Sequence, residues 1–210
     1  MMNENRIKIA VNGGVGFGAK LNAKQLITLA KYLGEEEELE LTVFQQLYIE
    51  VEEHQLEETV KDLEGVGLKC YPVGNFVKSL RTCNFCKGAV QEGMPTATKL
   101  NELIAGKPVP FTLRVAYTGC PVACGEPLIN DIGVIKRKDT FELYLGGKAK
   151  GIDAKTGHLF NDGLTEQVLL DSVQKVISIY EINGKKRETF SKFINRYGID
   201  NLKKQIVSED

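Results

Sequence analysis

The alternation of apolar and polar residues in the first third of the chain has two periods, one typical of strands and one typical of helices. It predicts the order β-α-β-α-β in the segments 6–14, 22–34, 39–51, 54–67 and 68–73. The third segment is expected to be one long strand with Leu41 and Val43 on its buried side. In the first helix, Asn22 is the expected N-cap, and Leu26 and Ile27 are expected to face the core. Together these elements predict a compact α+β unit.

The remaining two thirds of the chain predict a second group of elements that ends in helices. The expected elements are a helix over roughly 90–105, a strand over 111–119, a hairpin over 131–147, and helices over 165–184, 187–198 and 200–207. No repeat or low-complexity linker separates the two groups, and the seam is expected near residues 73–80. We therefore expect two domains, over residues 1–75 and 76–210.

Composition narrows the classes of function. The 210 residues carry a net charge of −1, which argues against a nucleic-acid or membrane-surface role because both require a basic face. The sequence shows no leader peptide and no apolar run of about 18 residues, so we expect a soluble, cytoplasmic protein. Five cysteines without a secretory signal are expected to be reduced thiols or metal ligands. Cys70, in the predicted strand 68–73, is interpreted as a small packing residue.

The other four cysteines form two close pairs. Cys83 and Cys86 are spaced C-x2-C, Cys120 and Cys124 are spaced C-x3-C, and 33 residues separate the pairs. The spacing suits structural zinc, an iron–sulfur cluster, or a redox dithiol made of the first pair alone. Pro121 fixes the turn after one cysteine, and the neighbouring residues are small or apolar. These features favour a cluster over zinc.

A glycine-rich loop follows the first predicted strand. Gly14, Gly16 and Ala19 loosely match the fingerprint of dinucleotide-binding sites. That fingerprint requires its glycines to open the helix, whereas the helical pattern here starts only at Asn22. We interpret the loop as a turn in which glycine's tolerance of positive φ is sufficient.

Arg114 stands apart from the other cations of the second domain because it lies inside the predicted strand 111–119. It precedes Cys120 by six residues. A buried arginine requires an anion, and a ligand rich in carboxylates would supply one.

Two longer stretches carry a resemblance to a known family. The stretch "LRVAYTGCPVACGEPLINDIGVI", followed by "FELYLGGKAKG", resembles the sirohaem-binding segment of the nitrite/sulfite reductases. The resemblance extends over nearly the whole chain, but to only one of the two pseudo-repeated halves of full-length members. It implies an α+β fold, with a ferredoxin-like half-domain over 1–75. A nitrite/sulfite reductase-type α/β cluster-binding domain with C-terminal helices is implied over 76–210.

The resemblance also implies a redox chemistry. The four cysteines would hold a [4Fe–4S] cluster, and Cys124 would also bridge to the iron of sirohaem or a related tetrapyrrole. Electrons would pass through the shared thiolate to sulfite or nitrite. A redox protein such as ferredoxin would supply them, and a half-size chain would pair with itself as a homodimer.

The resemblance assigns roles to particular residues. Lys78, Arg81 and Lys87 are the expected catalytic cations for the oxyanion. The expected cofactor-binding residues are Arg114, Phe44, Thr42 and Cys124, and the expected metal ligands are Cys83, Cys86, Cys120 and Cys124.

The sequence departs from the family pattern mainly on the substrate side. The family's strand reads Arg-Leu-Thr-Thr-Arg-Gln, and here Glu40 and Phe44 replace both arginines. Lys78 stands where the family has arginine, which keeps the charge but loses bidentate geometry. Val122 replaces an asparagine, and the upstream cysteines are spaced C-x2-C instead of C-x5-C.

These departures leave two rival functions open. One is an electron-transfer or assembly protein that carries a cluster and no haem, which the loss of the strand arginines favours. The other is a zinc-stabilised binding domain.

Overall fold

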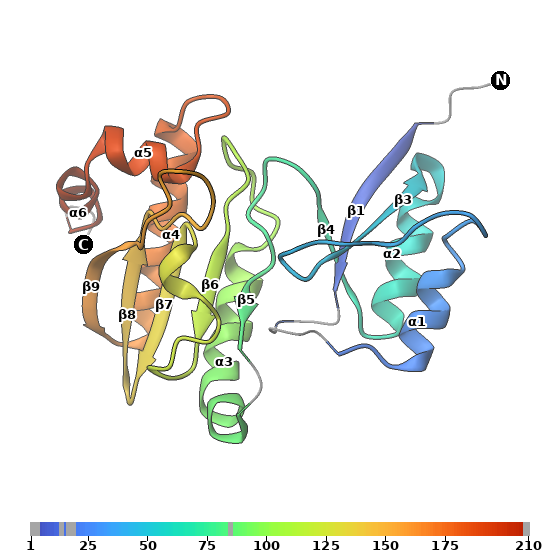
Figure 1. Ribbon diagram of the computed structural model, residues 1–210, viewed down its shortest axis with the longest axis horizontal. Coiled ribbons are helices and arrows are strands. Elements are labelled where there is room, and N and C mark those ends of the chain that lie inside the picture. The colour runs from blue at the N-terminus through green and yellow to red at the C-terminus, as the bar shows by residue number, and fades with distance from the viewer. Residues whose placement is uncertain (1–4, 13–14, 16–19, 84–85, 208–210) are drawn as a thin grey trace. The chain divides into compact units, whose positions relative to one another are not determined.

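The computed structural model describes residues 5–12, 15, 20–83 and 86–207. Figure 1 shows two compact units, Met1–Val73 and Gly74–Asp210. The glycine-rich loop that loosely matches a dinucleotide fingerprint lies, apart from Val15, outside the described residues.

The first unit is an antiparallel sheet with two helices. Its strands are β1 (Arg6–Asn12), β2 (Glu40–Leu41), β3 (Leu47–Glu52) and β4 (Lys69–Pro72), in the spatial order β2-β3-β1-β4. Its helices are α1 (Ala23–Ala30), the short 3-10 helix η1 (Glu53–Gln55) and α2 (Leu56–Gly65). Apolar residues of the sheet and helices, such as Val11, Leu29 and Leu63, form its buried core. Cys70 packs against this core as expected, and burial raises the pKa of its thiol to about 12.

The expected long strand over 39–51 is wrong, because the chain reverses in the middle of it. The backbone N–H groups of Thr42 and Gln45 donate to Gln46 and Thr42 carbonyls at 2.9 Å, and Gln45 adopts a positive φ of 62°. This turn pairs β2 with β3 as a hairpin. Leu41 and Val43, expected to be buried, are therefore 69% and 74% exposed.

Helix α1 begins where the sequence predicts but buries a different face. Asn22 forms a capping box with Gln25, in which each side chain accepts a hydrogen bond from the other's backbone N–H. The buried residues are Gln25, Thr28 and Leu29, whereas Leu26 and Ile27 are exposed. The polar Gln25 can be buried because its amide donates to the Val66 carbonyl, 3.2 Å away.

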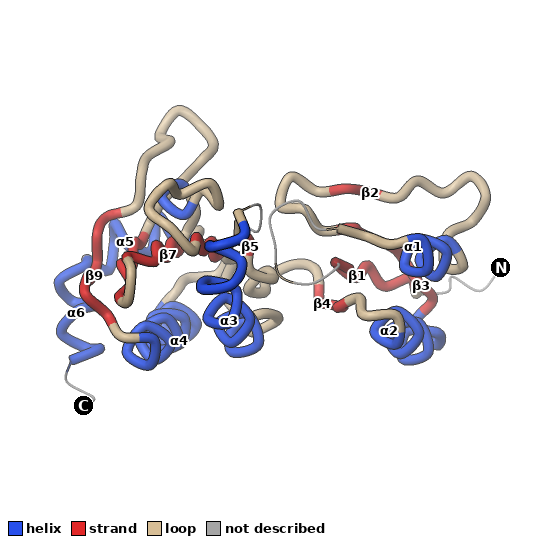
Figure 2. The backbone as a smooth tube through the Cα atoms, turned by 90° about the horizontal axis from the view of Figure 1, so that it is seen from below, coloured by secondary structure: helices blue, strands red, loops and turns tan. Residues whose placement is uncertain are grey.

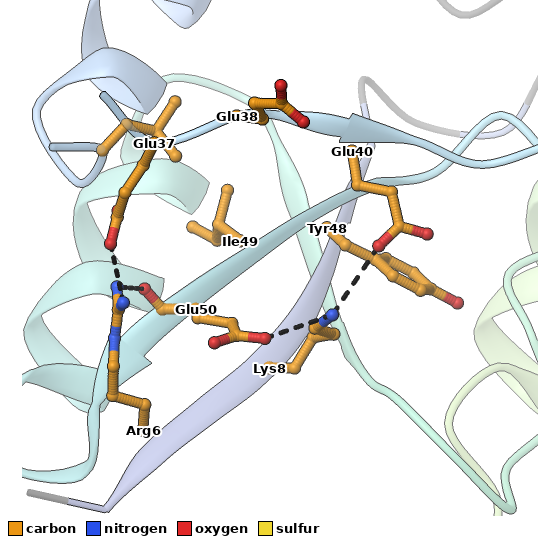
Figure 3. Close-up of a pocket in the computed structure, with 9 residues that line it drawn as sticks. Arg6, Lys8, Glu37, Glu38, Glu40, Tyr48, Ile49 and Glu50 are labelled. Atoms are coloured by element: carbon orange, nitrogen blue, oxygen red, sulfur yellow. Dashed lines mark hydrogen bonds and ion pairs between the residues drawn. The ribbon is translucent and has the colours of Figure 1, made fainter. Parts of the chain in front are cut away.

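Charged residues line a pocket beside the sheet of the first unit (Figure 3). Lys8 Nζ lies 3.1 Å from a Glu50 carboxylate oxygen and 3.6 Å from one of Glu40. Arg6 is paired with Glu37 at 2.6 Å. The negative charge of Glu40, which stands where the family pattern has an arginine, is thus partly neutralised by Lys8 of the same sheet.

The second unit is built on a mixed sheet. Its strands are β5 (Arg81–Thr82), β6 (Val115–Thr118), β7 (Ile132–Arg137), β8 (Thr140–Leu145) and β9 (His158–Leu164), which are neighbours in that order. The pairs β5–β6 and β6–β7 are parallel, and the pairs β7–β8 and β8–β9 are antiparallel. Helices α3 (Lys87–Ile104) and α4 (Glu166–Asn183) lie side by side along one face of the sheet (Figure 2).

Most of the expected elements of this unit are present. The hairpin β7–β8 and the helices α4, α5 (Phe190–Tyr197) and α6 (Ile199–Val207) are confirmed, and a 3-10 helix, η2 (Pro127–Ile129), joins β6 to β7. The sequence pattern predicts no element over residues 148–164, where the structure has the edge strand β9; this strand contains Asn161, Asp162 and Gly163, which are typical of turns. Its pairing with β8 is correspondingly irregular. Among the described residues, no helix combines the length and apolarity needed to cross a bilayer.

A charged contact fixes the segment between α4 and α5. Both Nε and Nη2 of Arg196 donate to the Glu188 carboxylate at 2.7 Å. The backbone N–H of Lys185 donates to the same carboxylate. Arg196, and after it the Lys185 amide, lower the Glu188 pKa from its ordinary 4.5 to about 2. The Glu188 side chain is 10% exposed and the Arg196 side chain 36% exposed, so solvent screens the pair from the arginine side.

We expect Glu188→Gln to destabilise the protein by about 2 kcal/mol at pH 7, because a charge-assisted bidentate contact is lost. The native pKa lies below the unfolded value, so the contribution is complete above pH 4.5 and is lost as the pH falls toward 2. Urea denaturation of both proteins across this pH range measures the difference. The exposed Glu181→Gln is the control, and an equal effect of the two substitutions at pH 7 would contradict the assignment.

Candidate iron–sulfur site

Two adjacent parallel strands deliver the two cysteine pairs to one edge of the sheet. Thr82 of β5 pairs with Tyr117 of β6, and the strands run in the same direction. Cys83 follows β5 directly, and Cys120 lies two residues beyond the end of β6. Because parallel strands end at the same edge, the turns that follow them lie beside each other.

The four cysteine thiols lie near one another. Loss of hydration raises the pKa of the Cys124 thiol, and the nearness of the other three thiols raises it further. Cys83 is buried and Cys120 half-buried, whereas Cys86 and Cys124 are exposed. The site therefore has a buried side and an open side.

The backbone around the cysteines suits anionic ligands and a tight turn. Cys86 is the N-cap of α3, where the helix dipole favours the negative charge of a metal-bound thiolate. The Ala123 N–H donates to the Cys120 carbonyl at 3.3 Å, which closes the turn. Ala123 and Glu126, on either side of Cys124, have positive φ angles of 60° and 56°. Such angles are uncommon for residues other than glycine, so the turn that holds Cys124 is locally strained.

Gly125 lets the two cysteine turns approach each other. A Cβ at this position would lie 2.5 Å from the Tyr117 carbonyl oxygen and 3.4 Å from the Cys83 nitrogen. The first distance is shorter than any real contact of a Cβ atom. Only glycine fits here, so the sequence C-G after the last cysteine is a packing requirement of the site.

Arg81, one of the expected catalytic cations, contacts a residue beside the cysteines. Its Nη1 lies 3.0 Å from a carboxylate oxygen of Glu126, which follows Cys124 by two residues. The Arg81 side chain is only 12% exposed. Arg81 thus has an internal carboxylate partner beside the cysteines.

Lys78 and Arg114 lie toward the opposite end of their strands. Both precede a strand, β5 and β6 respectively, whereas the cysteines follow those strands. At roughly 3.3 Å per residue, the length of β6 alone separates Arg114 from the cysteine edge by roughly 13 Å. The Arg114 N–H donates to Asp131 at 2.9 Å. Burial raises the pKa of the Asp131 carboxyl to about 6, although the Arg114 amide and charge oppose this rise.

The remaining expected site residues have different positions. Lys87 is the first residue of α3, and its side chain lies outside the described part of the structure. Thr42 and Phe44 belong to the first unit, in the turn between β2 and β3. Phe44 is buried and Thr42 is half-buried. The roles of these three residues stay predictions.

Sequence reasoning missed Glu126 and Asp131. Both are acidic residues near turns, and isolated acids of this kind are usually solvated. The sequence marks these two acids only by their positions. Glu126 follows the last cysteine by two residues, and Asp131 directly precedes β7. Spacing alone could not show that Arg81 pairs with Glu126 or that the Arg114 N–H donates to Asp131.

Comparison with known proteins identifies the second unit. Residues 76–210 match the family described as the nitrite and sulphite reductase 4Fe-4S domain. The chain belongs to this family. The expected family and the expected α+β fold are thereby confirmed.

Relatives of this family member carry different names. A cobalt-factor III methyltransferase of Priestia megaterium is 29% identical over 201 residues, which cover 94% of this chain and 37% of that protein. An assimilatory-type sulfite reductase of Nitratidesulfovibrio vulgaris is 23% identical over 133 residues, which cover 63% of this chain and 61% of that protein. The chain thus spans less than two thirds of the length of either relative.

A solved structure shows the same fold over nearly the whole chain. The NirA protein of Mycobacterium tuberculosis superposes with a TM-score of 0.72 at 18% identity. The match covers 97% of this chain and 40% of that one.

The residues of the site fit the cluster that the family name specifies. Four thiols from two turns are the donor set of a [4Fe–4S] cluster, and the turns approach closely because Gly125 lacks a side chain. Within the described residues, no three His, Cys, Asp or Glu side chains surround a single-ion position. The family, and not this geometry, decides between zinc and a cluster. Near the cysteines, Arg81 pairs with the Glu126 carboxylate, and at the other end of β6 the backbone N–H of Arg114 donates to Asp131.

We expect Gly125→Ala to separate the two cysteine turns, because its Cβ would overlap the Tyr117 carbonyl. The expected result is a loss of stability of about 1–3 kcal/mol and a lower iron content after anaerobic reconstitution. Urea denaturation and iron analysis measure both effects. Gly65→Ala is the control, because a Cβ at that position would contact nothing within 4 Å. Full iron binding by Gly125→Ala would show that the close approach is not required.

Proposed function

We propose that the chain is a redox enzyme that reduces a small oxyanion such as sulfite or nitrite. A [4Fe–4S] cluster on Cys83, Cys86, Cys120 and Cys124 would supply the electrons, and a sirohaem-type iron bridged at Cys124 would be the place of reduction. One observation supports the cluster assignment, namely that Cys83 and Cys120 follow two adjacent parallel strands at the same edge of the sheet.

In this proposal the cysteines have different roles, because they differ in exposure. Cys83 is buried and would anchor the cluster against the sheet. Cys124 is exposed, and an exposed thiolate keeps a second side on which another iron could bind. This exposure supports Cys124 as the shared ligand. A ferredoxin-like protein is the proposed donor, and pairing of two copies is the proposed assembly.

The cations of the second unit would bind the oxyanion in this proposal. Lys78, Arg81 and Lys87 would offset the negative charge that grows on the substrate as electrons arrive. Arg81 would have to leave its partner Glu126 to do so. Exchanging Glu126 for the substrate costs Arg81 little free energy only if the incoming anion binds as closely as the carboxylate does.

A second candidate function is electron transfer by a cluster without haem. Three observations favour it. Glu40 and Phe44 stand where the family has arginines, and Glu40 is offset by Lys8. The arginine nearest the cysteines is already paired. The relative that covers 94% of this chain is named as a methyltransferase and not as a reductase.

Anaerobic purification tests the cluster and the haem together. We expect about four iron atoms per chain and no zinc, because the family domain takes four thiolates for one cubane. The reductase proposal also requires tetrapyrrole absorption in the Soret region and consumption of sulfite or nitrite with reduced methyl viologen. Iron without Soret absorption or turnover would support the electron-transfer candidate, and one zinc per chain would exclude both.

Cys124→Ser probes the bridge. We expect this variant to lose the spectroscopic coupling between cluster and haem, together with most of the activity, because the shared thiolate is gone. Cys70→Ser is the matched control, since Cys70 packs in the first unit and belongs to no cysteine pair. Unchanged spectra and activity in Cys124→Ser would refute the bridge.

A further inference from the structure

Beyond the ligands, we propose that Arg81 and Glu126 are positioning residues that hold the two cysteine turns together and set the reduction potential of the cluster. This inference rests on the cluster of the proposed function. It gives Arg81 a different task from oxyanion binding.

Two contacts join the segments 81–83 and 124–126. Arg81 Nη1 lies 3.0 Å from a carboxylate oxygen of Glu126. Gly125 packs so close to Cys83 that a Cβ on it would lie 3.4 Å from the Cys83 nitrogen. We call the two contacts together the cysteine clip, and the ion pair is its outer contact.

The outer contact of the clip starts from a fixed backbone on both sides. Arg81 belongs to β5, which is hydrogen-bonded to β6. The Glu126 N–H donates to the Ala123 carbonyl at 2.9 Å, and the Asn130 side chain donates to the Glu126 carbonyl at 2.8 Å. The backbone of both partners is therefore held by other hydrogen bonds, and the ion pair has to order only the two side chains. The pair can therefore restrain the turn that carries Cys124.

The same pair places charge beside the cluster ligands. Arg81 belongs to β5 and lies only two residues before the first ligand, Cys83. Arg81 is 12% exposed, and a weakly solvated charge is poorly screened. A positive charge near a cluster stabilises its reduced, more negative form, and the Glu126 carboxylate opposes that effect. The pair is thus close to neutral only while both members are present.

The two single substitutions should move the potential in opposite directions. Glu126→Gln leaves the charge of Arg81 without its carboxylate partner, so the cluster potential should rise. Arg81→Gln leaves the Glu126 carboxylate, so the potential should fall. The double variant removes both charges and should return close to the wild-type potential. A purely structural role would not produce opposite signs.

The experiment uses the full chain with its cluster, prepared anaerobically, and an electron paramagnetic resonance titration of the potential. Loss of iron to a chelator is the second measurement. Both single variants should lose iron several-fold faster than wild type, and the charge-swapped Arg81→Glu/Glu126→Arg variant should recover part of the difference. The control pair is Arg6→Gln and Glu37→Gln, an ion pair of the first unit that should change neither quantity (Figure 3).

The outcomes separate the inference from the proposed function. A wild-type chain without iron would overturn both. A wild-type chain with a cluster, and single variants with unchanged potential and unchanged iron loss, would overturn only the cysteine clip. Shifts of the same sign in both single variants would also overturn it. Should Arg81→Gln fail to fold, Glu126→Gln decides alone, because its side chain is 46% exposed and it replaces one carboxyl oxygen by an amide.

Discussion

The parallel pairing of β5 with β6 is the constraint on which the cysteine site depends. These strands place two segments that lie more than thirty residues apart in sequence at one edge of a sheet. If the strands were antiparallel neighbours, the turn after β5 and the turn after β6 would lie at opposite edges. Parallel neighbours require a crossover connection, and helix α3 supplies it. Cys86, the second cysteine of the first pair, is the N-cap of this helix.

The close approach at this edge restricts the residues around the cysteines. Gly125 packs against a carbonyl of β6, and Ala123 and Glu126 take up positive φ angles. Backbone strain of this kind persists only where the surrounding structure fixes it, and here the sheet and η2 do so. Cys124, which is exposed, thus lies in a turn that the surrounding backbone constrains.

Pairing of charges within the chain shapes what the site can bind. Arg81 pairs with Glu126, and the backbone N–H of Arg114 donates to Asp131. An anionic ligand has to compete with these internal carboxylates. A reductase would exchange these carboxylates for its substrate, whereas an electron carrier would keep them. Family membership alone leaves that difference open, because the relatives carry names of both reductases and a methyltransferase.

The sequence by itself determined the α+β class, the hairpin β7–β8, the C-terminal helices and the two cysteine pairs. Each of these follows from local periodicity or spacing, which the chain carries whatever its tertiary structure. It did not determine the reversal at Gln45, the buried face of α1 or the edge strand β9, because turn hydrogen bonds and sheet pairing override local pattern there. Only the tertiary structure placed Glu126 against Arg81, and only it set Lys78 and Arg114 at the far ends of their strands. Contacts between distant segments depend on strand direction and register, and neither is written in the pattern of apolar residues.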